Sequence, residues 1–596
     1  MARSTLLAVT AMESYWGGSE PDAFLGRWCL PYPAELTAPK RLTRVVDYPW
    51  YPRQTRVAAY RYCSDLKDTL LGAIAPALDA LHGTEYSVHG WNLMLGAWLH
   101  RMVMSAYHHH DCLLRARDQF PDLLMHGPAA ETCLPPGTTE QFFRDFRGSH
   151  RHHALISDLA TALGVRCERH LPDGSAADPD QDPPPQQSGA VAGRSWVKEY
   201  VKSVGKRAAR RATLHANCVL YSASLNVKEA NALMLASRFR IARLPLVSLA
   251  EERWPAPDNA MRTRLSAQLA AGSGLDGFGR LLAGIVFGNF PVSFGEGFGQ
   301  LKNIVSENFP RRATRIVSSM AWVGDDAFSL WAAERKMAGA MLVSAQHGGG
   351  YGVREMLSGS EFIEDQVTDR FLAWGPATVV GADSRSLPVP PHFHLSGARK
   401  GGGRLFYIGG TGGLLFPYGF MSAVDGPDAI EYIERQARFF RALPENLVRQ
   451  FLIRPNPHDF GWSEKARLLD AIPGLAIDDY SEDFTARLAQ ARLAVVDNMN
   501  TTYLQAMGSG VPTLLVWDSE IWSLNPDAEE AFGELREAGV FFSDPAAAAA
   551  AVAWISDDPL SWWHSRPVAD AVRTFLGRYY RADNAWLQAW RRELLA

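Results

Sequence analysis

The chain has 596 residues, of which 47% are hydrophobic and 21% are charged, so it can form two or more domains with large cores. Its formal net charge of −4 and pI near 6.5 exclude a strongly basic protein whose main partner is nucleic acid. The sequence contains no uninterrupted apolar run of the ~18 residues that span a membrane, and its N-terminus is a poor signal peptide, so we expect a cytoplasmic protein, with peripheral contact to the inner membrane left open.

The first part of the chain predicts one strand followed by packed helices. The segment "TLLAVTAM" (5–12) is typical of a buried parallel strand. Residues 55–125 carry apolar and aromatic side chains at helical spacing. They include three consecutive histidines, 108–110, which would point in different directions on a helix. We therefore expect this run at the surface or at a helix end rather than around a metal ion.

Two segments of biased composition come next. Residues 172–195, "PDGSAADPDQDPPPQQSGAVAGRS", are rich in proline and acidic residues and predict a flexible surface loop. Residues 198–211, "KEYVKSVGKRAARR", are strongly basic. This basic segment is either the solvated face of a helix or a patch that contacts anionic lipid head groups or a phosphate-bearing acceptor.

Strands and helices then alternate in two blocks. The first block predicts strands at 216–225, 314–321 and 340–346 and helices at 227–239 and 325–339. The second block predicts strands at 404–410, 449–455, 474–478, 492–498 and 512–517, with helices between them.

This alternation predicts an α/β protein with a GT-B-like architecture, in which two Rossmann-like domains face a cleft and the N-terminal half carries helical additions. We expect an N-terminal acceptor-side Rossmann-like domain at 1–375, a C-terminal nucleotide-sugar-binding Rossmann-like domain at 376–560 and closing helices at 561–596.

Parallel sheets bind ligands beyond the carboxyl ends of their strands, so the residues that follow each strand of the second block are candidates. Gly409, Gly410 and Gly412 form a glycine turn that either approaches a phosphate or is only a turn. Arg454 at a strand tip can pair with a phosphate, and His458 follows it in the same turn.

The stretch "DNMNTTYLQAMGSGVP" (497–512) leads from a strand into a helix. Asn498 ends the strand, and Thr501 and Thr502 begin the helix. The threonines either cap the helix or offer hydroxyl groups and amides to a phosphate at its positive end.

In the first block, "SAQHGGGYG" (344–352) places His347 directly after a strand and before Gly348, Gly349 and Gly350. A nucleotide loop does not need a histidine there, whereas a general acid or base must be presented to the substrate in this way. We therefore predict that His347 is catalytic and that the three glycines aim it and contact an anionic substrate, with a buried structural histidine as the alternative.

Four stretches together resemble a family of transferases that are encoded in bacterial O-antigen and surface-carbohydrate gene clusters: "TAMESYWGGSEPDAFLGRWC", "LWAAERKMAGAMLVSAQHGGGYG", "EFIEDQVTDRFLAWG" and "VVDNMNTTYLQAMGSGVPTLLVW". The plan is distantly similar to that of the capsule β-Kdo transferases, which hold CMP with a basic-Pro-His-Pro motif and a Ser/Thr pair. Arg454-Pro455-Asn456-Pro457 matches the first motif with asparagine in place of histidine, and Thr501-Thr502 matches the second.

The resemblance implies a glycosyltransferase of surface polysaccharide biosynthesis that takes a nucleotide-sugar donor, with a CMP-ulosonic acid as the expected donor, and a glycan or lipid-linked acceptor. No Asp-x-Asp motif follows a strand, so we expect a metal-independent enzyme without a cofactor. Catalytic candidates besides His347 are Glu13, after the first strand, with a helix-capping role as the alternative, and Asp326, at a helix start, with a first-turn helix charge as the alternative.

Three other functions remain open: transfer of a hexose from a UDP or GDP donor, transfer of a polyol phosphate from a CDP donor, and nucleotide-sugar binding without catalysis. Glu361 and Asp369 lie in the motifs that carry the resemblance but receive no chemical role.

Overall fold

The structure is a computed structural model that describes residues 4–30, 32, 44–50, 53–146, 148–170, 216–272, 274–381, 383–394, 403–410, 427–459 and 461–596. The insert at 172–195, the basic segment at 198–211 and Gly412 lie outside the described residues. None of the helices in the described ranges is both long enough and apolar enough to span a bilayer.

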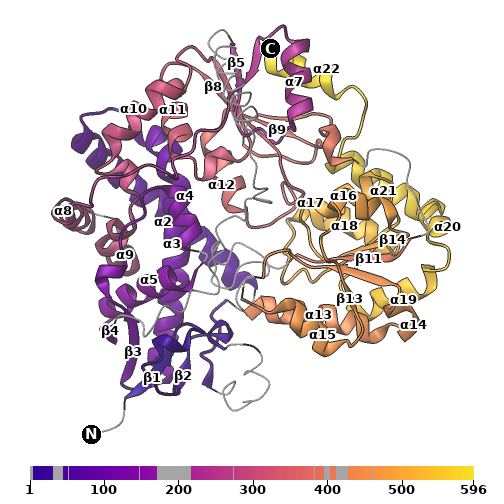
Figure 1. The fold of residues 1–596 in the computed structure, drawn as a ribbon, viewed down its shortest axis with the longest axis horizontal. Coiled ribbons are helices and arrows are strands. Elements are labelled where there is room, and N and C mark those ends of the chain that lie inside the picture. Colours follow the sequence, from indigo (N-terminus) through magenta and orange to yellow (C-terminus); the bar gives the residue numbers. More distant parts are fainter. Residues whose placement is uncertain are drawn as a thin grey trace, which may run out of the picture.

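Three parallel sheets organise the chain (Figure 1). The N-terminal sheet has the strand order β2-β1-β3-β4. Its strands are β1 (Thr5–Ala8), β2 (Ala23–Phe24), β3 (Leu123–Pro128) and β4 (Arg166–His170).

The middle sheet has the order β10-β9-β8-β7-β5-β6. Its strands are β5 (Cys218–Leu220), β6 (Ile241–Arg243), β7 (Arg315–Ser318), β8 (Met341–Ala345), β9 (Arg370–Ala373) and β10 (Ser384–Ser386). The C-terminal sheet has the order β13-β12-β11-β14-β15-β16. Its strands are β11 (Leu405–Ile408), β12 (Phe451–Arg454), β13 (Ala476–Ile477), β14 (Leu493–Val496), β15 (Thr513–Val516) and β16 (Phe541–Phe542).

The predicted α/β class with two Rossmann-like domains and additional helices is confirmed by the middle and C-terminal sheets. The strands of both sheets pair in parallel, and most of their residues are buried, as sheets covered by helices require. The N-terminal part differs in detail from the expectation, because β1 to β4 pair only with one another among the described strands. The chain before the C-terminal sheet therefore holds two sheets rather than one, and the second of them extends to β10 at Ser384–Ser386. The proposed boundary at 375 stays a prediction.

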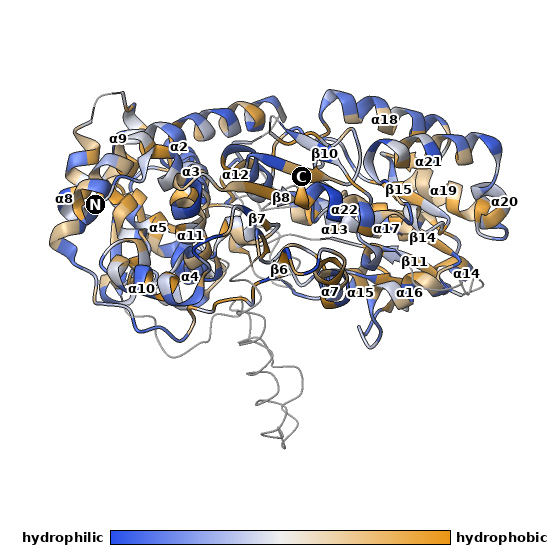
Figure 2. Cartoon of the chain, turned by 90° about the horizontal axis from the view of Figure 1, so that it is seen from above, coloured by the Kyte–Doolittle hydropathy of each residue, from blue (hydrophilic) through white to orange (hydrophobic). Residues whose placement is uncertain are grey.

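Long helices fill the space beside the N-terminal sheet, in agreement with the helical pattern at 55–125. Figure 2 shows these helices at one end of the molecule, helices α18 to α21 at the other, and the middle sheet between them. The helices of the first half are α2 (Arg53–His82), α3 (Ser87–Gln119), α4 (Thr139–Asp145), α5 (Ser149–Ala162), α7 (Val227–Ala236), α8 (Asn259–Ala270), α9 (Gly277–Ile285), α10 (Phe298–Asn308), α11 (Asp326–Met337) and α12 (Gly359–Val367).

The second half has helices α13 (Pro427–Ala442), α14 (Glu445–Val448), α15 (Glu464–Ala471), α16 (Phe484–Gln490), α17 (Thr501–Gly508), α18 (Pro526–Glu537), α19 (Pro545–Ile555), α20 (Pro559–Trp563), α21 (Arg566–Tyr579) and α22 (Trp586–Leu595). The last helix, α22, returns to the middle sheet and lies beside α7 (Figure 1). There the indole of Trp590 donates to the carbonyl of Pro388 at 2.8 Å, and Glu593 pairs with Arg370 at 2.6 Å. The final helix thus ties the two ends of the α/β region together.

The expected surface position of the three histidines at 108–110 is wrong. They lie inside α3, where His108 and His109 are fully buried. Both buried histidines have a partner from elsewhere in the fold: Trp50 Nε1 donates to His108 Nδ1 at 2.6 Å, and His109 Nε2 lies 3.1 Å from His152 Nδ1. His109 Nδ1 is buried without a hydrogen-bond partner among the described residues.

Candidate functional site

The C-terminal sheet has the strand order of a dinucleotide-binding Rossmann fold, with its switch point between β11 and β14. Ligands bind such sheets in the crevice outside the strand ends at this point. Gly409 and Gly410 follow β11, and Asp497 and Asn498 follow β14. The sequence-predicted residues of these two strand ends are therefore neighbours.

A buried hydrogen-bond cluster organises this strand end around Asp497. Tyr432 from α13 donates to Asp497 Oδ1 at 2.6 Å, and Gln436 donates to Oδ2 at 2.9 Å. Burial raises the pKa of Asp497 to about 6, although these hydrogen bonds oppose the shift. The carboxyl group thus fixes α13 against β14 and faces protein donors rather than solvent.

Gly409 and Gly410 are closely packed against the same cluster. Their amides are already bonded within the protein, that of Gly409 to the carbonyl of Arg454 at 3.0 Å and that of Gly410 to the Tyr432 hydroxyl at 2.6 Å. A Cβ atom on Gly410 would lie 2.9 Å from Asn498 Cγ, which is too close. The geometry therefore favours a packing role for these two glycines over direct binding of a phosphate.

The threonine pair lies at the start of α17, with its amides at the positive end of the helix dipole. The N-cap residue is Asn500, and its side chain makes no cap hydrogen bond. Thr501 is half-buried, and Thr502 Oγ1 is buried without a hydrogen-bond partner among the described residues. The threonines therefore do not cap the helix, which leaves their hydroxyl groups for another use.

The glycine loop after β8 packs directly on α17. A Cβ atom on Gly348 would lie 3.7 Å from Thr501 Oγ1, and one on Gly349 would lie 2.7 Å from the carbonyl oxygen of Asn500. Tyr503 donates its hydroxyl proton to the carbonyl of Gly349 at 3.0 Å. Gly349 is thus required for the close approach between the middle-sheet loop and the start of α17, whereas Gly348 is in ordinary contact with Thr501 and a Cβ atom on Gly350 would meet Arg354. The predicted catalytic and phosphate-binding segments are adjacent.

His347 lies at the beginning of this loop and is largely enclosed, with 17% of its side chain exposed. The Tyr351 hydroxyl lies 3.1 Å from His347 Nδ1 and donates to Glu364 Oε2 at 2.7 Å. Burial lowers the pKa of His347 to about 4. Burial also raises the pKa of Glu364 well above its ordinary value. At neutral pH His347 is therefore an uncharged imidazole connected through Tyr351 to a buried carboxyl group.

Glu361 and Asp369 have supporting positions near the loop. Glu361 accepts a hydrogen bond from the amide of Gly352 at 3.1 Å, and burial raises its pKa to about 7. Asp369 accepts from the amide of Leu342 at 2.8 Å and pairs with Lys336. Both side chains therefore hold backbone segments on either side of His347.

Arg454 and His458 do not converge with the threonines. Arg454 Nη1 donates to Asp478 Oδ2 at 2.8 Å, and its guanidinium group lies 4.8 Å from the Tyr480 ring. These partners lie toward β13, whereas α17 follows β14, and β12 and β14 are two strand spacings apart, or about 10 Å. His458 is exposed in the turn after β12.

The other two catalytic candidates lie on different elements from His347. Glu13 is exposed on a short 3-10 helix (Glu13–Tyr15) that follows β1 of the N-terminal sheet. Asp326, in the first turn of α11, is buried and accepts from the Ser293 hydroxyl at 2.6 Å and the Thr139 amide at 3.0 Å. Burial raises the pKa of Asp326 to about 7. These contacts give Asp326 a structural role in joining α4 to α11.

Sequence reasoning missed Tyr351 and Glu364 as partners of His347. A signal for Glu364 was present, since Glu361 and Glu364 are three residues apart in one helix and share one face. Tyr351 had no such signal, because its position depends on how the loop turns back toward α12.

Comparison with known proteins gives a family and a set of distant structures. A model of the LIC12162 family of transferases matches residues 5–594. No curated protein matches the chain. Among solved structures, the chain is similar to an α,α-trehalose-phosphate synthase (UDP-forming) from Burkholderia vietnamiensis, with 12% identity, a TM-score of 0.35, and coverage of 64% of this chain and 96% of that one.

Two further solved structures give similar values. MurG from Acinetobacter baumannii has 11% identity and a TM-score of 0.31, with 64% of this chain and 99% of that one covered. Anabaena Alr3699/HepE, solved in complex with UDP-glucose, has 11% identity and a TM-score of 0.34, with 63% and 98% covered.

Proposed function

The chain belongs to the LIC12162 family of transferases, and we propose that it is a metal-independent glycosyltransferase of bacterial surface polysaccharide biosynthesis. In this proposal the nucleotide-sugar donor binds at the carboxyl end of the C-terminal sheet, with a CMP-ulosonic acid as the expected donor. The acceptor, a glycan or lipid-linked glycan, approaches from the side of the middle sheet.

The observation that carries the proposal is the contact between the His347 loop and the start of α17. Gly348 lies beside Thr501, and Tyr503 holds the carbonyl of Gly349. A transferase needs a proton acceptor next to the site where the leaving phosphate is held. This contact brings together a histidine from one sheet and the positive end of a helix from the other.

His347 is suited to remove a proton from an acceptor hydroxyl group. Its imidazole is uncharged at neutral pH because burial lowers its pKa to about 4. Since the Tyr351 hydroxyl donates to Glu364, the tautomer of His347 with its proton on Nδ1 can donate to the Tyr351 oxygen at 3.1 Å. In that tautomer Nε2, which lies 3.3 Å from the same Tyr351 hydroxyl, is the unprotonated nitrogen and would act as the base. Tyr351 and Glu364 would act as positioning residues, because they touch His347 rather than substrate.

The phosphate of the donor would bind at the start of α17. Thr501 is half-buried and offers its hydroxyl group, whereas Thr502 Oγ1 is buried without a partner among the described residues and would reach a phosphate only if the start of α17 shifted. Amides at a helix start favour an anion. Asn498 would line the same strand end. Arg454 would join the site only by exchanging its contact with Asp478 for the phosphate, and His458 would contribute from the exposed turn.

We also propose that the basic segment at 198–211, which lies outside the described residues, contacts the membrane. Anionic lipid head groups near a lipid-linked acceptor would attract its lysines and arginines.

The donor class can be tested by measuring thermal stabilisation of the purified protein by CMP, CDP, UDP and GDP. A nucleotide at 100 times its Kd stabilises a single-site protein by about 2.7 kcal/mol. Stabilisation by CMP alone supports the ulosonic-acid donor, and stabilisation by UDP or GDP replaces it with a hexose donor. Absence of any stabilisation contradicts a nucleotide site. Phosphate retained in the product would identify a CDP-dependent phosphotransferase instead.

The role of His347 can be tested with His347→Ala. We expect a rate loss of about 10²–10⁴-fold with nearly unchanged nucleotide affinity, because general base catalysis contributes this much. The exposed His564 at the end of α20 provides the control His564→Ala, which should retain full activity. Near wild-type transfer by His347→Ala would show that the histidine only packs.

A further inference from the structure

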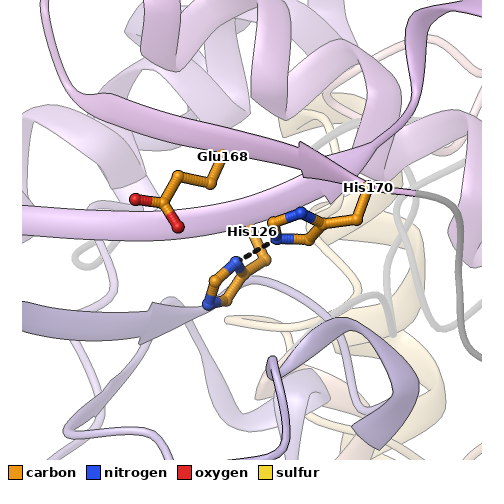
Figure 3. A group of neighbouring side chains, drawn as sticks. All are labelled: His126, Glu168 and His170. Atoms are coloured by element: carbon orange, nitrogen blue, oxygen red, sulfur yellow. Dashed lines mark hydrogen bonds between the residues drawn. The ribbon is translucent and has the colours of Figure 1, made fainter.

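Three metal-ligand side chains share one face of the N-terminal sheet at the carboxyl ends of its strands. His126 is on β3, and Glu168 and His170 are on β4. The parallel register pairs His126 with Glu168, and His170 follows two residues later. Successive odd or even residues of a strand point to the same side, so the three side chains face one another across the two strands. Figure 3 shows this arrangement.

The ligand atoms of these residues are close together. One ligand atom from each of His126, Glu168 and His170 lies within 4.8 Å of the other two. His126 Nδ1 and His170 Nε2 are 2.5 Å apart (Figure 3). Among the described residues, no other group of three or more histidine, cysteine or acidic residues meets this spacing.

The backbone around His126 holds its ring in this orientation. A Cβ atom on Gly17 would lie 2.5 Å from His126 Nε2, so the glycine backbone packs against that edge of the ring. Gly17 has a φ of +65°, which other residues rarely adopt. His153 Nε2 lies 2.6 Å from the carbonyl oxygen of His126 and fixes the strand beneath it. Nδ1 is therefore the nitrogen that faces His170.

The ion pair that would compete with a metal ion for Glu168 is weak. Arg166 pairs with Glu168 at 3.1 Å, and both side chains are about half exposed or more, at 61% and 45%. Exposed ion pairs of this kind stabilise a protein by about 0–1 kcal/mol. A divalent ion that binds two imidazoles and a carboxylate would readily displace Arg166 from Glu168.

We propose that His126, Glu168 and His170 bind a zinc ion at the carboxyl edge of the N-terminal sheet. Two imidazole nitrogens and one carboxylate oxygen form a ligand set that zinc accepts, whereas magnesium and calcium prefer oxygen ligands alone. Zinc–nitrogen bonds of 2.0–2.1 Å in tetrahedral geometry place the two nitrogens ~3.3 Å apart. To bind zinc, the two nitrogens must therefore move apart by less than ~1 Å, which small side-chain rotations at the surface allow.

Three protein ligands leave the fourth position of a tetrahedral zinc ion for water or an anionic group of a substrate. The site lies in a different sheet from His347 and α17, so it is separate from the proposed transfer site. The ion would join β4, whose last residue is His170, to the adjacent strand β3.

The test is a zinc titration of the chelator-treated full chain by isothermal calorimetry. Cobalt is used in parallel, because its visible absorption reports the ligand set. We expect one zinc ion per chain in the wild type. The double variant His126→Ala/His170→Ala should bind it at least about 100-fold more weakly, since even the loss of a residue that only hydrogen-bonds to a metal ligand costs about 10–100-fold.

Two single variants make the test specific. Glu168→Gln should weaken zinc binding and alter the cobalt spectrum, while the exposed control His564→Ala should bind like the wild type. Glu168 is exposed, so loss of folding does not confound this variant. Equal zinc affinity of the wild type and the double variant, or no zinc bound by the wild type, would overturn the proposal.

Discussion

Asp326→Asn is a sharp test of whether Asp326 is structural, because it removes a charge without removing a hydrogen-bond acceptor. In the structure a single oxygen, Oδ2, accepts from Ser293 and from the Thr139 amide. An asparagine oxygen can accept both of these bonds. The side chain is 2% exposed, so the substitution changes almost no contact with solvent.

The gain in stability that we expect for Asp326→Asn over the wild type depends on pH. Burial raises the pKa of Asp326 from 3.8 to about 7 in the folded state. Between these values the folded chain binds a proton that the unfolded chain has lost, so the aspartate costs stability as pH rises. The cost grows by about 1.4 kcal/mol per pH unit and reaches about 4 kcal/mol above pH 7. Asparagine does not titrate and avoids this cost.

Urea unfolding of wild type and Asp326→Asn at pH 4, 5, 6, 7 and 8 measures this difference. The stability advantage of the variant should increase from pH 4 to 7 and then stay constant. Asp557→Asn, at an exposed position, should show no such trend. A pH-independent difference would contradict a buried, neutral carboxyl group. Loss of transfer in a stable Asp326→Asn protein would make the aspartate catalytic after all.

Three further predictions concern the loop, the arginine and the basic segment. Gly349→Ala should destabilise the protein by about 1–3 kcal/mol in urea unfolding, because its Cβ would lie 2.7 Å from the carbonyl oxygen of Asn500; an unchanged midpoint would mean that the loop moves away freely. Arg454→Ala should cost about 2 kcal/mol, since it removes one partner of the buried Asp478 but leaves Arg487 3.4 Å away, and a nucleotide affinity unaffected by it would exclude a phosphate contact. If 198–211 binds lipid, the amount of protein that sediments with anionic liposomes should fall as salt rises, because exposed charges are screened beyond about 10 Å at 0.1 M salt. No binding at low salt would show that 198–211 is only a solvated segment.

The sequence predicted the strands of the two Rossmann-like sheets well because their signals are local. The run at 492–498 contains β14 (Leu493–Val496), and 512–517 contains β15 (Thr513–Val516). Buried parallel strands are continuous apolar runs bounded by polar or glycine residues, and each run is visible by itself. The assignment of β1 to a separate sheet was not predictable in this way. Strand pairing depends on long-range contacts, and a strand followed by a helix has the same sequence pattern whichever sheet the strand joins.

The candidate site shows the same division between local and long-range information. The position of His347 after a strand was evident, and the structure places it there. The direction in which the Arg454 side chain points was not evident from the sequence, because its partner Asp478 follows a neighbouring strand 24 residues later. The sequence could identify residues at strand ends, but not which of two neighbouring strands each long side chain would contact.

Of the three glycines after His347, Gly349 can be explained by shape alone. Gly349 faces the Asn500 backbone and the Tyr503 ring, at 2.7 Å and 2.9 Å from its would-be Cβ, and its carbonyl accepts the Tyr503 hydroxyl. The loop thus contacts the start of α17 through its backbone. A movement of α17 when a phosphate binds at Thr501 would be transmitted to the backbone one residue from His347, since Gly348 lies beside Thr501. Donor binding and the position of the base would then be coupled, so a nucleotide bound without its sugar should already change the environment of His347.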